Sequence, residues 1–310
     1  MGGLRSQRPR VASIRRLSGP VAAVDIGTNS TKLLIVDESG AEIIRTVRVT
    51  GLGRGVDGAG RLAADAIDRT VAVLADYGSA LRRHSVDSVR AVATSASRDA
   101  ANRDEFFDAA EQALGVRPEV IAGTEEAMLS FAGAASVAAD PTHAVVVDIG
   151  GGSTEFVSDH AAVSVDIGSI RLTERCLPDH PATTSQLAQG RTEAARIIAT
   201  RDLPHRGSAI GVAGTWTSLS AMHHELTAYD SRAVHRSQLT LDDVRLLVAR
   251  LARLSLEEKL AIPSLDPGRA PVILGGTIVA EAALQALALD QITISERDLL
   301  DGVCSGLLTG

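Results

Sequence analysis

Aromatic residues are scarce in this chain of 310 residues, making up only 2% of it. Single-stranded nucleic-acid sites stack bases on aromatic faces, so this composition argues against such a site. The formal net charge of −7 argues in the same direction, because a general polyanion-binding surface needs an excess of Lys and Arg. We therefore expect no nucleic-acid partner.

Cysteine and long apolar runs are also scarce. Cys176 and Cys304 stand far apart and in no metal-ligand spacing, which is typical of buried thiols in a reducing compartment. No apolar stretch reaches the roughly 18 residues that a membrane-spanning helix needs. We therefore expect a soluble, cytoplasmic protein without a membrane partner.

Acidic residues are missing from residues 1–19, which contain five arginines. This composition predicts a disordered basic arm, and the lack of an apolar core segment excludes a secretory signal. The remaining chain is rich enough in apolar residues, at 45% of the whole, to form real cores. Its length predicts two domains of roughly 150 residues each.

The most informative feature is a repeated segment. Residues 24–32 read Val-Asp-Ile-Gly-Thr-Asn-Ser-Thr-Lys, and 123 positions later residues 147–155 read Val-Asp-Ile-Gly-Gly-Gly-Ser-Thr-Glu. Each copy predicts a strand, a tight turn and a second strand. Glycine allows φ > 0 and lets other groups approach the backbone, so the N–H groups of such a turn can form a nest for phosphate oxygens. Two facing nests predict a clamp for a phosphorylated substrate.

The order of predicted elements is also duplicated. Strands are predicted over 21–50 and again over 144–167, each set followed by alternating helices and strands. This pattern predicts two α/β domains with a ligand site in the cleft between them. We place their boundaries at 20–135 and 136–310 and expect the last helix to pack back on the first domain.

Two local predictions accompany this fold. The Thr124 hydroxyl is expected to cap the helix that carries Glu125 and Glu126, and residues 272–275 are expected to form a turn or strand that leads into Gly275-Gly276. Acidic residues in the first turn of a helix are ordinary, because they favour the helix dipole. Glu125 and Glu126 therefore have a structural interpretation as well as a catalytic one.

The motifs together resemble the exopolyphosphatase and guanosine pentaphosphate phosphatase (Ppx/GppA) family of the actin-like ATPase-domain superfamily. The resemblance covers about residues 20–305, departs from the family pattern at residues 211–215, and has Lys32 where Arg is common. It implies two actin-like (ribonuclease H-like) α/β domains, and the short two-domain form favours short polyphosphate. The motifs that carry it are residues 25–30, 93–102, 123–127, 148–155, 168–174 and 273–276.

The resemblance implies that Glu126 is the general base that orients and deprotonates the attacking water. It implies that Asp148 and Glu155 bind Mg²⁺ or Mn²⁺, because hard cations prefer oxygen ligands, and Asp25 could share that task. Arg98 and Lys32 would supply positive charge, with surface ion pairs as their structural alternative. The phosphate-binding set is Asp25, Gly27, Thr28, Asn29, Ser30, Lys32, Thr94, Ser95, Arg98, Gly150, Gly151, Gly152, Ser153, Gly214 and Thr215.

The expected function is a metal-dependent exopolyphosphatase that releases orthophosphate by direct attack of water. Phosphorylation of Ser153 is the rival mechanism, and no His lies within its motif. Alternative functions are a guanosine pentaphosphate phosphatase, a kinase or ATPase of the same superfamily, and a non-catalytic sensor of polyphosphate or guanosine pentaphosphate. The family resemblance also implies a homodimer.

Overall fold

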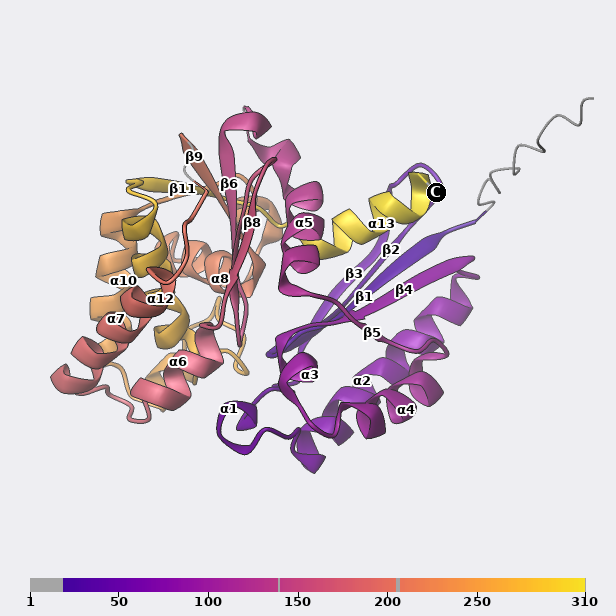
Figure 1. Cartoon of the computed structure of the whole chain (residues 1–310), viewed down its shortest axis with the longest axis horizontal. Helices are drawn as coiled ribbons and strands as arrows, with labels where there is room; N and C mark the ends of the chain where they lie inside the picture. Colours follow the sequence, from indigo (N-terminus) through magenta and orange to yellow (C-terminus); the bar gives the residue numbers. More distant parts are fainter. Residues whose placement is uncertain (1–18, 139, 205–206, 310) are drawn as a thin grey trace, which may run out of the picture.

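The computed structural model describes residues 19–138, 140–204 and 207–309. Apart from Gly19, the basic arm predicted over residues 1–19 lies outside the described residues. Within them the chain forms two sheets with helices packed around each (Figure 1). No helix of the described part is both long and apolar enough to cross a bilayer.

The first sheet has the strand order β3-β2-β1-β4-β5. Strands β1, β2 and β3 form an antiparallel meander, and β4 and β5 continue the sheet parallel to β1. Both β1 and β2 are almost fully buried, which explains their continuous apolar runs. The strands are β1 (Val21–Ile26), β2 (Ser30–Val36), β3 (Glu42–Val49), β4 (Ser88–Ala93) and β5 (Glu119–Val120).

The second sheet repeats this arrangement, with the order β10-β11-β9-β6-β7-β8. Here β6, β7 and β8 form the antiparallel meander, and β9 runs parallel to β6 as β4 does to β1. The repeat confirms the expected α/β class. The strands are β6 (Ala144–Ile149), β7 (Thr154–Val157), β8 (Ala162–Val165), β9 (Ser208–Val212), β10 (Gln238–Thr240) and β11 (Gln291–Ile294).

Helices α1 to α4 belong with the first sheet, and we call this unit the first lobe; α6 to α12 and the second sheet form the second lobe. Short 3₁₀ helices at Ala135–Val137 and Pro141–His143 lead into β6. The helices are α1 (Val56–Ala59), α2 (Ala64–Arg83), α3 (Ser95–Asp99), α4 (Arg103–Leu114), α5 (Gly123–Ala134), α6 (Ser169–Cys176), α7 (Thr184–Ile198), α8 (Ala213–His223), α9 (Ser231–Val234), α10 (Leu241–Arg253), α11 (Leu256–Leu260), α12 (Ile273–Ala286) and α13 (Leu299–Thr309).

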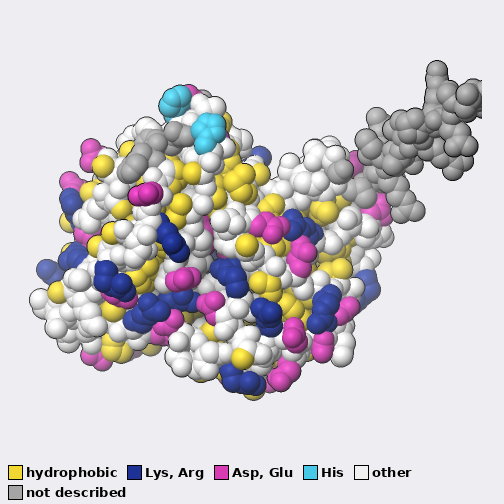
Figure 2. Space-filling model, viewed as in Figure 1, with side chains coloured by type: hydrophobic (Ala, Val, Ile, Leu, Met, Phe, Trp, Pro, Cys, Tyr) yellow, Lys and Arg dark blue, Asp and Glu magenta, His cyan; other side chains and the backbone are white. Residues whose placement is uncertain are grey.

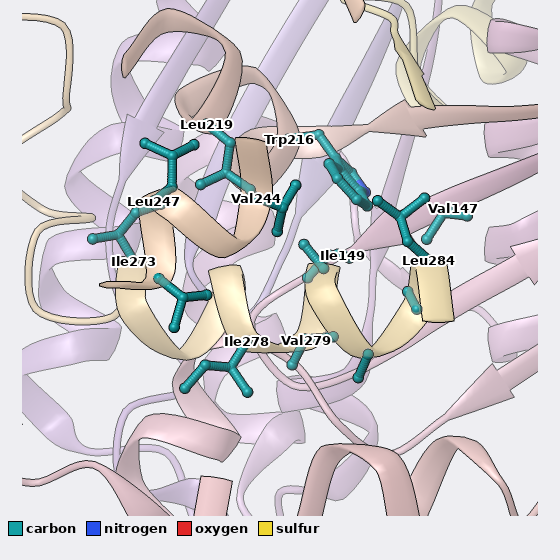
Figure 3. Close-up of a cluster of buried hydrophobic side chains, with 14 of the residues drawn as sticks. Val147, Ile149, Trp216, Leu219, Val244, Leu247, Ile273, Ile278, Val279 and Leu284 are labelled. Carbon is teal, nitrogen blue, oxygen red and sulfur yellow. The ribbon is translucent and has the colours of Figure 1, made fainter. Parts of the chain in front are cut away.

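Each lobe has its own core. In the first lobe, side chains such as Leu74 of α2 and Phe106 of α4 are buried together with one face of the sheet. In the second lobe, α12 lies in the middle of a larger core that includes the fully buried Trp216 (Figure 3). A Cβ at Gly211 would lie 2.7 Å from the Trp216 ring, so this strand position needs glycine.

Helices α5 and α13 are exchanged between the lobes. Helix α5 lies within the range proposed for the first domain but packs on the second sheet, whereas the C-terminal α13 covers β1 and β2 of the first sheet (Figure 1). The two helices also pack closely on each other, because a Cβ at Gly302 would lie 2.0 Å from the Leu129 carbonyl oxygen. The boundary between residues 135 and 136 stays a prediction.

Two local predictions were wrong. Helix α5 begins at Gly123 with Ala122 as its N-cap, and no side chain caps it, so Thr124 does not have the expected role. Gly275 and Gly276 lie inside α12 rather than in a turn. A Cβ at Gly275 would lie 2.3 Å from Thr173 Oγ1 on α6, so glycine serves here to bring two helices together.

Candidate active site

The cleft between the lobes is lined by residues 27–30 of the first repeated turn, by residues 150, 151 and 153 of the second, and by the start of α8. Most of the predicted site residues line it. Ser95 and Gly152 instead line a small adjoining depression, and Arg98 and Glu155 stand beside Glu126 without lining the cleft. The predicted residues on its wall are Asp25, Gly27, Thr28, Asn29, Ser30, Lys32, Thr94, Glu126, Asp148, Gly150, Gly151, Ser153, Gly214 and Thr215.

The two turns contact each other directly. A Cβ at Gly151 would lie 2.9 Å from Thr28 Cβ and 3.1 Å from the backbone nitrogen of Asn29, and a Cβ at Gly152 would lie 2.6 Å from Ser95 Oγ. None of the glycines at 27, 150, 151 and 152 has the left-handed φ that the sequence permitted. Glycine is needed at 151 and 152 because the lobes approach each other there, and at 27 because a Cβ would lie 2.9 Å from the Ser30 carbonyl oxygen of its own turn.

The duplication extends to the hydrogen bonds of the turns. The Gly27 N–H donates to Ser30 O and the Gly150 N–H donates to Ser153 O, each at 3.0 Å. These two amides are therefore not free to bind phosphate, which corrects part of the predicted nest. Thr28 Oγ1 is also engaged, since it accepts a hydrogen bond from the Ala96 N–H.

Lys32 forms a buried ion pair and not the surface pair considered from sequence. Its Nζ lies 2.8 Å from Asp298 Oδ2 and 3.1 Å from Asp25 Oδ2. Burial acts to lower the pKa of Lys32, but the charges of Asp298 and Asp25 hold it above its ordinary value. Asp298 comes just before α13, far along the chain, and sequence reasoning missed it because no local pattern marks it.

Three carboxylates stand close enough to affect one another. Burial, and then the charges of Glu155 and Asp148, raise the pKa of Glu126 well above its ordinary value. Burial and the charge of Asp148 raise the pKa of Glu155 to about 8. Burial raises the pKa of Asp148 to about 6, although Lys32 and the Ser130 hydroxyl act to lower it. The cleft therefore concentrates negative charge that a cation or a proton must balance.

Arg98 is the cation nearest to Glu126. Its Nη1 donates to the Ile121 carbonyl oxygen at 2.8 Å and lies 3.6 Å from Glu126 Oε2. The guanidinium is partly exposed, so it keeps donors available for an anion. Arg269 is a second cation on the cleft wall, and it was not predicted. Its Nη1 donates to the Gly214 carbonyl oxygen and to Ser218 Oγ, each at 3.0 Å.

The donor atoms fit a hard divalent cation. Glu126 Oε2, Glu155 Oε2 and Asp25 Oδ1 are buried oxygens without a hydrogen-bond partner. Among the described residues no group of three or more His, Cys, Asp or Glu side chains is arranged as ready metal ligands.

Comparisons with known proteins agree with this geometry. The model of the Ppx/GppA phosphatase family matches residues 34–309. Exopolyphosphatase 2 of Mycobacterium tuberculosis is 42% identical over 312 residues, which cover 93% of this chain and 98% of that protein. The matched region includes both lobes, because it covers nearly all of each chain.

Solved structures show the same relationship. The crystal structure of the Aquifex aeolicus Ppx/GppA family member superposes with a TM-score of 0.78 at 29% identity, covering 94% of this chain and 98% of that one. An exopolyphosphatase from Cytophaga hutchinsonii superposes with a TM-score of 0.83 at 27% identity, with the same coverage of 94% and 98%. The expected α/β fold class, with two sheets of duplicated order, is confirmed. This chain therefore belongs to the Ppx/GppA phosphatase family.

Proposed function

We propose that this protein is an exopolyphosphatase that hydrolyses the terminal phosphoanhydride bond of short inorganic polyphosphate and releases orthophosphate. The observation that carries the proposal is the state of Glu126, a buried carboxylate on the cleft wall with one unpartnered oxygen and a raised pKa. A raised pKa makes a carboxylate a stronger proton acceptor than an ordinary one, as a general base requires. The 42% identity to an exopolyphosphatase supports the choice of substrate.

In this proposal Glu126 accepts a proton from the attacking water while the turns hold the phosphate oxygens. The backbone N–H groups of residues 28–30 and 151–153 remain candidates, with the hydroxyls of Ser30 and Ser153. Arg98, 3.6 Å from Glu126 Oε2, would stabilise charge on the phosphoryl group next to the base. Positioning and electrostatics supply most of the catalysis in such a reaction.

A divalent cation completes the proposal. Asp148 and Glu155 are its proposed ligands, with Asp25 as an additional oxygen donor, and the cation would neutralise charge on the terminal phosphoryl group. Direct attack of water is preferred to phosphorylation of Ser153, because no His lines the cleft among the described residues. A homodimer is part of the proposal because the family resemblance implies it, and a cytoplasmic location is part of it because of the composition of the chain.

A second substrate class is favoured by a neighbouring pocket. It shares Lys32, Gly214 and Arg269 with the cleft, and Tyr229 and Leu265 contribute to walls that are more apolar than those of the cleft. A ligand with a flat ring at one end and phosphates at the other would fit the pair of cavities. Guanosine pentaphosphate is the first such candidate and ATP the second.

The test measures orthophosphate release from short polyphosphate, long polyphosphate, guanosine pentaphosphate and ATP in parallel, with Mg²⁺ or Mn²⁺ and with a chelator. We expect turnover of short polyphosphate that the chelator abolishes. Turnover of ATP alone would replace the proposal with a kinase or ATPase. Tight polyphosphate binding without any release would identify a sensor, and the Glu126→Gln variant controls for contaminating phosphatases.

A further inference from the structure

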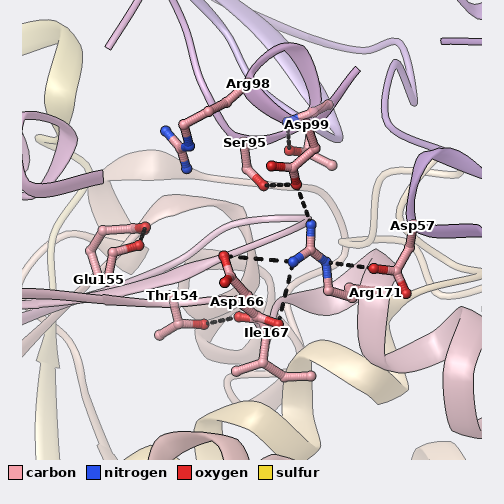
Figure 4. Close-up of polar contacts among 12 residues, drawn as sticks. Asp57, Ser95, Arg98, Asp99, Thr154, Glu155, Asp166, Ile167 and Arg171 are labelled. Carbon is pink, nitrogen blue, oxygen red and sulfur yellow. Dashed lines mark hydrogen bonds and ion pairs between the residues drawn. The ribbon is translucent and has the colours of Figure 1, made fainter. Parts of the chain in front are cut away.

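Arg171 lies on α6 where the lobes meet, and its guanidinium is almost surrounded by carboxylates (Figure 4). Its Nη2 donates to Asp99 Oδ2 at 2.5 Å, and its Nε lies 3.2 Å from Asp57 Oδ1. The remaining nitrogen, Nη1, lies 3.6 Å from Asp166 Oδ1. Asp57 and Asp99 belong to the first lobe, so this buried cation joins the two lobes.

On its own side Arg171 is attached to the second repeated turn. The backbone N–H groups of Ile170 and Arg171 both donate to the Gly151 carbonyl oxygen, at 2.9 and 3.1 Å. The Ser169 N–H donates to the Gly150 carbonyl oxygen at 2.9 Å. The first turn of α6 is therefore hydrogen-bonded directly to residues 150 and 151.

On the other side, Asp99 ends α3, the helix that carries Ser95 and Arg98. The Ala96 N–H of this helix donates to Thr28 Oγ1 at 3.1 Å, which connects α3 to the first repeated turn. Ser95 Oγ donates to Asp99 Oδ2 at 3.5 Å. The Arg171 to Asp99 contact is thus a direct side-chain link between the elements that hold the two turns.

We propose that Arg171 is a positioning residue for the hydrolysis, so the inference rests on the function proposed above. It fixes the spacing of the two phosphate-binding turns and, through α3, the placement of Arg98 beside Glu126. Arg171 itself does not line the main cleft. Charge-assisted hydrogen bonds of this length are strong, and a misplacement of about 1 Å in a catalytic group can cost about 10²-fold in rate.

If Arg171 only held the lobes together, its loss should affect activity no more than the loss of another ion pair between them, and Arg175 provides that control. Arg175 is also on α6 and also joins the lobes, since its Nε and Nη2 donate to the two oxygens of Asp57 at 2.6 and 2.8 Å. No contact joins Arg175 to α3 among the described residues. If the lobes need only an ion pair between them, loss of either arginine should have the same effect.

The experiment compares Arg171→Met, Arg171→Lys, Asp99→Asn and Arg175→Met by steady-state kinetics on short polyphosphate. We expect Arg171→Met and Asp99→Asn to lower kcat by about 30-fold or more while KM changes by less than about 5-fold. Arg171→Lys and added guanidinium ion should each restore part of that loss, and Arg175→Met should keep kcat within about 3-fold. Equal losses in Arg171→Met and Arg175→Met, or an unchanged kcat in Asp99→Asn, would overturn the proposal.

A second readout does not depend on the substrate. Amide hydrogen exchange of residues 95–99 and 150–152 should become faster in Arg171→Met but not in Arg175→Met, each at a temperature where thermal unfolding shows a folded protein. Unchanged exchange in Arg171→Met would overturn the positioning role. If the wild-type protein does not hydrolyse polyphosphate, the exopolyphosphatase proposal fails, and the exchange experiment still decides whether Arg171 links the two turns.

Discussion

Lys32 and Glu155 occupy the same register position in the two halves of the molecule. Each stands on its second strand directly opposite the aspartate of the first strand, Lys32 opposite Asp25 and Glu155 opposite Asp148. The first lobe therefore balances its aspartate with a cation, whereas the second lobe sets two acids side by side. The two lobes therefore differ in the charge of the residue opposite the aspartate, and this difference can be tested at Lys32 and at Glu155.

Replacing Lys32 with Met should destabilise the protein strongly. It would leave Asp25 and Asp298 buried without their shared cation, and breaking a buried ion pair in this way costs about 3–5 kcal/mol. Urea denaturation measures the free energy of unfolding. The matched control is Arg117→Met, which breaks the exposed pairs with Asp108 and Glu111 and should cost less than about 1 kcal/mol. A loss below about 1 kcal/mol in Lys32→Met would show that the buried pair adds nothing.

Replacing Glu155 with Gln should stabilise the protein at high pH. The folded protein holds the Glu155 proton up to a pKa of about 8, whereas the unfolded chain releases it near 4.5, so stability falls as pH rises between these values. Gln keeps the acceptor for the Ser164 hydroxyl but cannot ionise. Denaturation with a chelator present should show a gain on the order of 1 kcal/mol near pH 9 and almost none near pH 5. A gain that is independent of pH would contradict the assignment.

Glu126→Gln should lower kcat by about 10²-fold or more and leave KM within a few-fold, as expected for the loss of a general base. Glu125→Gln is the control one residue away. The Glu125 carboxylate contacts Arg90 on the exposed side of α5, so kcat should stay within about 2-fold of the wild type. Near-normal kcat in Glu126→Gln would remove Glu126 from the mechanism.

Gly151→Ala should separate the two repeated turns. Its methyl group would lie 2.9 Å from Thr28 Cβ and 3.1 Å from the Asn29 backbone nitrogen, which cannot rotate away. We expect activity to fall by about 10-fold or more, measured as orthophosphate release. Gly58→Ala on α1 is the control, because nothing lies within 4 Å of its added methyl group. Equal activity of the two variants would show that the contact between the turns is dispensable.

Lys259→Met should stabilise the protein near neutral pH. Lys259 is fully buried with its Nζ 2.8 Å from His180 Nδ1, and burial lowers its pKa to about 8 from an ordinary 10.5. Between pH 8 and pH 10.5 the unfolded chain binds the Lys259 proton more tightly than the folded protein does. The buried charge therefore lowers the free energy of unfolding below pH 8, and this loss disappears as pH rises toward 10.5. Denaturation should show a gain of about 1 kcal/mol near pH 7 that shrinks near pH 10. The exposed Arg253→Met should show no such trend.

The sequence predicted most strands and most helices because their signals are local. The strands predicted over 144–167 include β6, β7 and β8, because buried strands leave apolar runs among neighbouring residues. It also predicted most of the cleft wall, because the duplicated motif fixed both turns. The reason for glycine at position 151 was not predictable, because it is the close approach of Thr28 from the other lobe.

The remaining parts of the site depend on contacts between residues far apart in the chain. Asp298 joins Lys32 across 266 positions, and Arg171 joins Asp99 across 72. Neither pair has a periodicity or spacing that could reveal it in one sequence. The exchange of α5 and α13 between the lobes was also not predictable in full, because the sequence of an apolar helix does not show which of two sheets it will pack on.

That exchange has a consequence for synthesis on the ribosome. The apolar side chains of Val21, Ala23 and Leu34 emerge long before the residues that cover them, such as Leu300 and Val303, have been translated. A nascent chain therefore presents one uncovered face of its first sheet to water until residues 299–309 have been made. Such a surface favours chaperone contact or aggregation during translation, and a chain released early would keep it exposed.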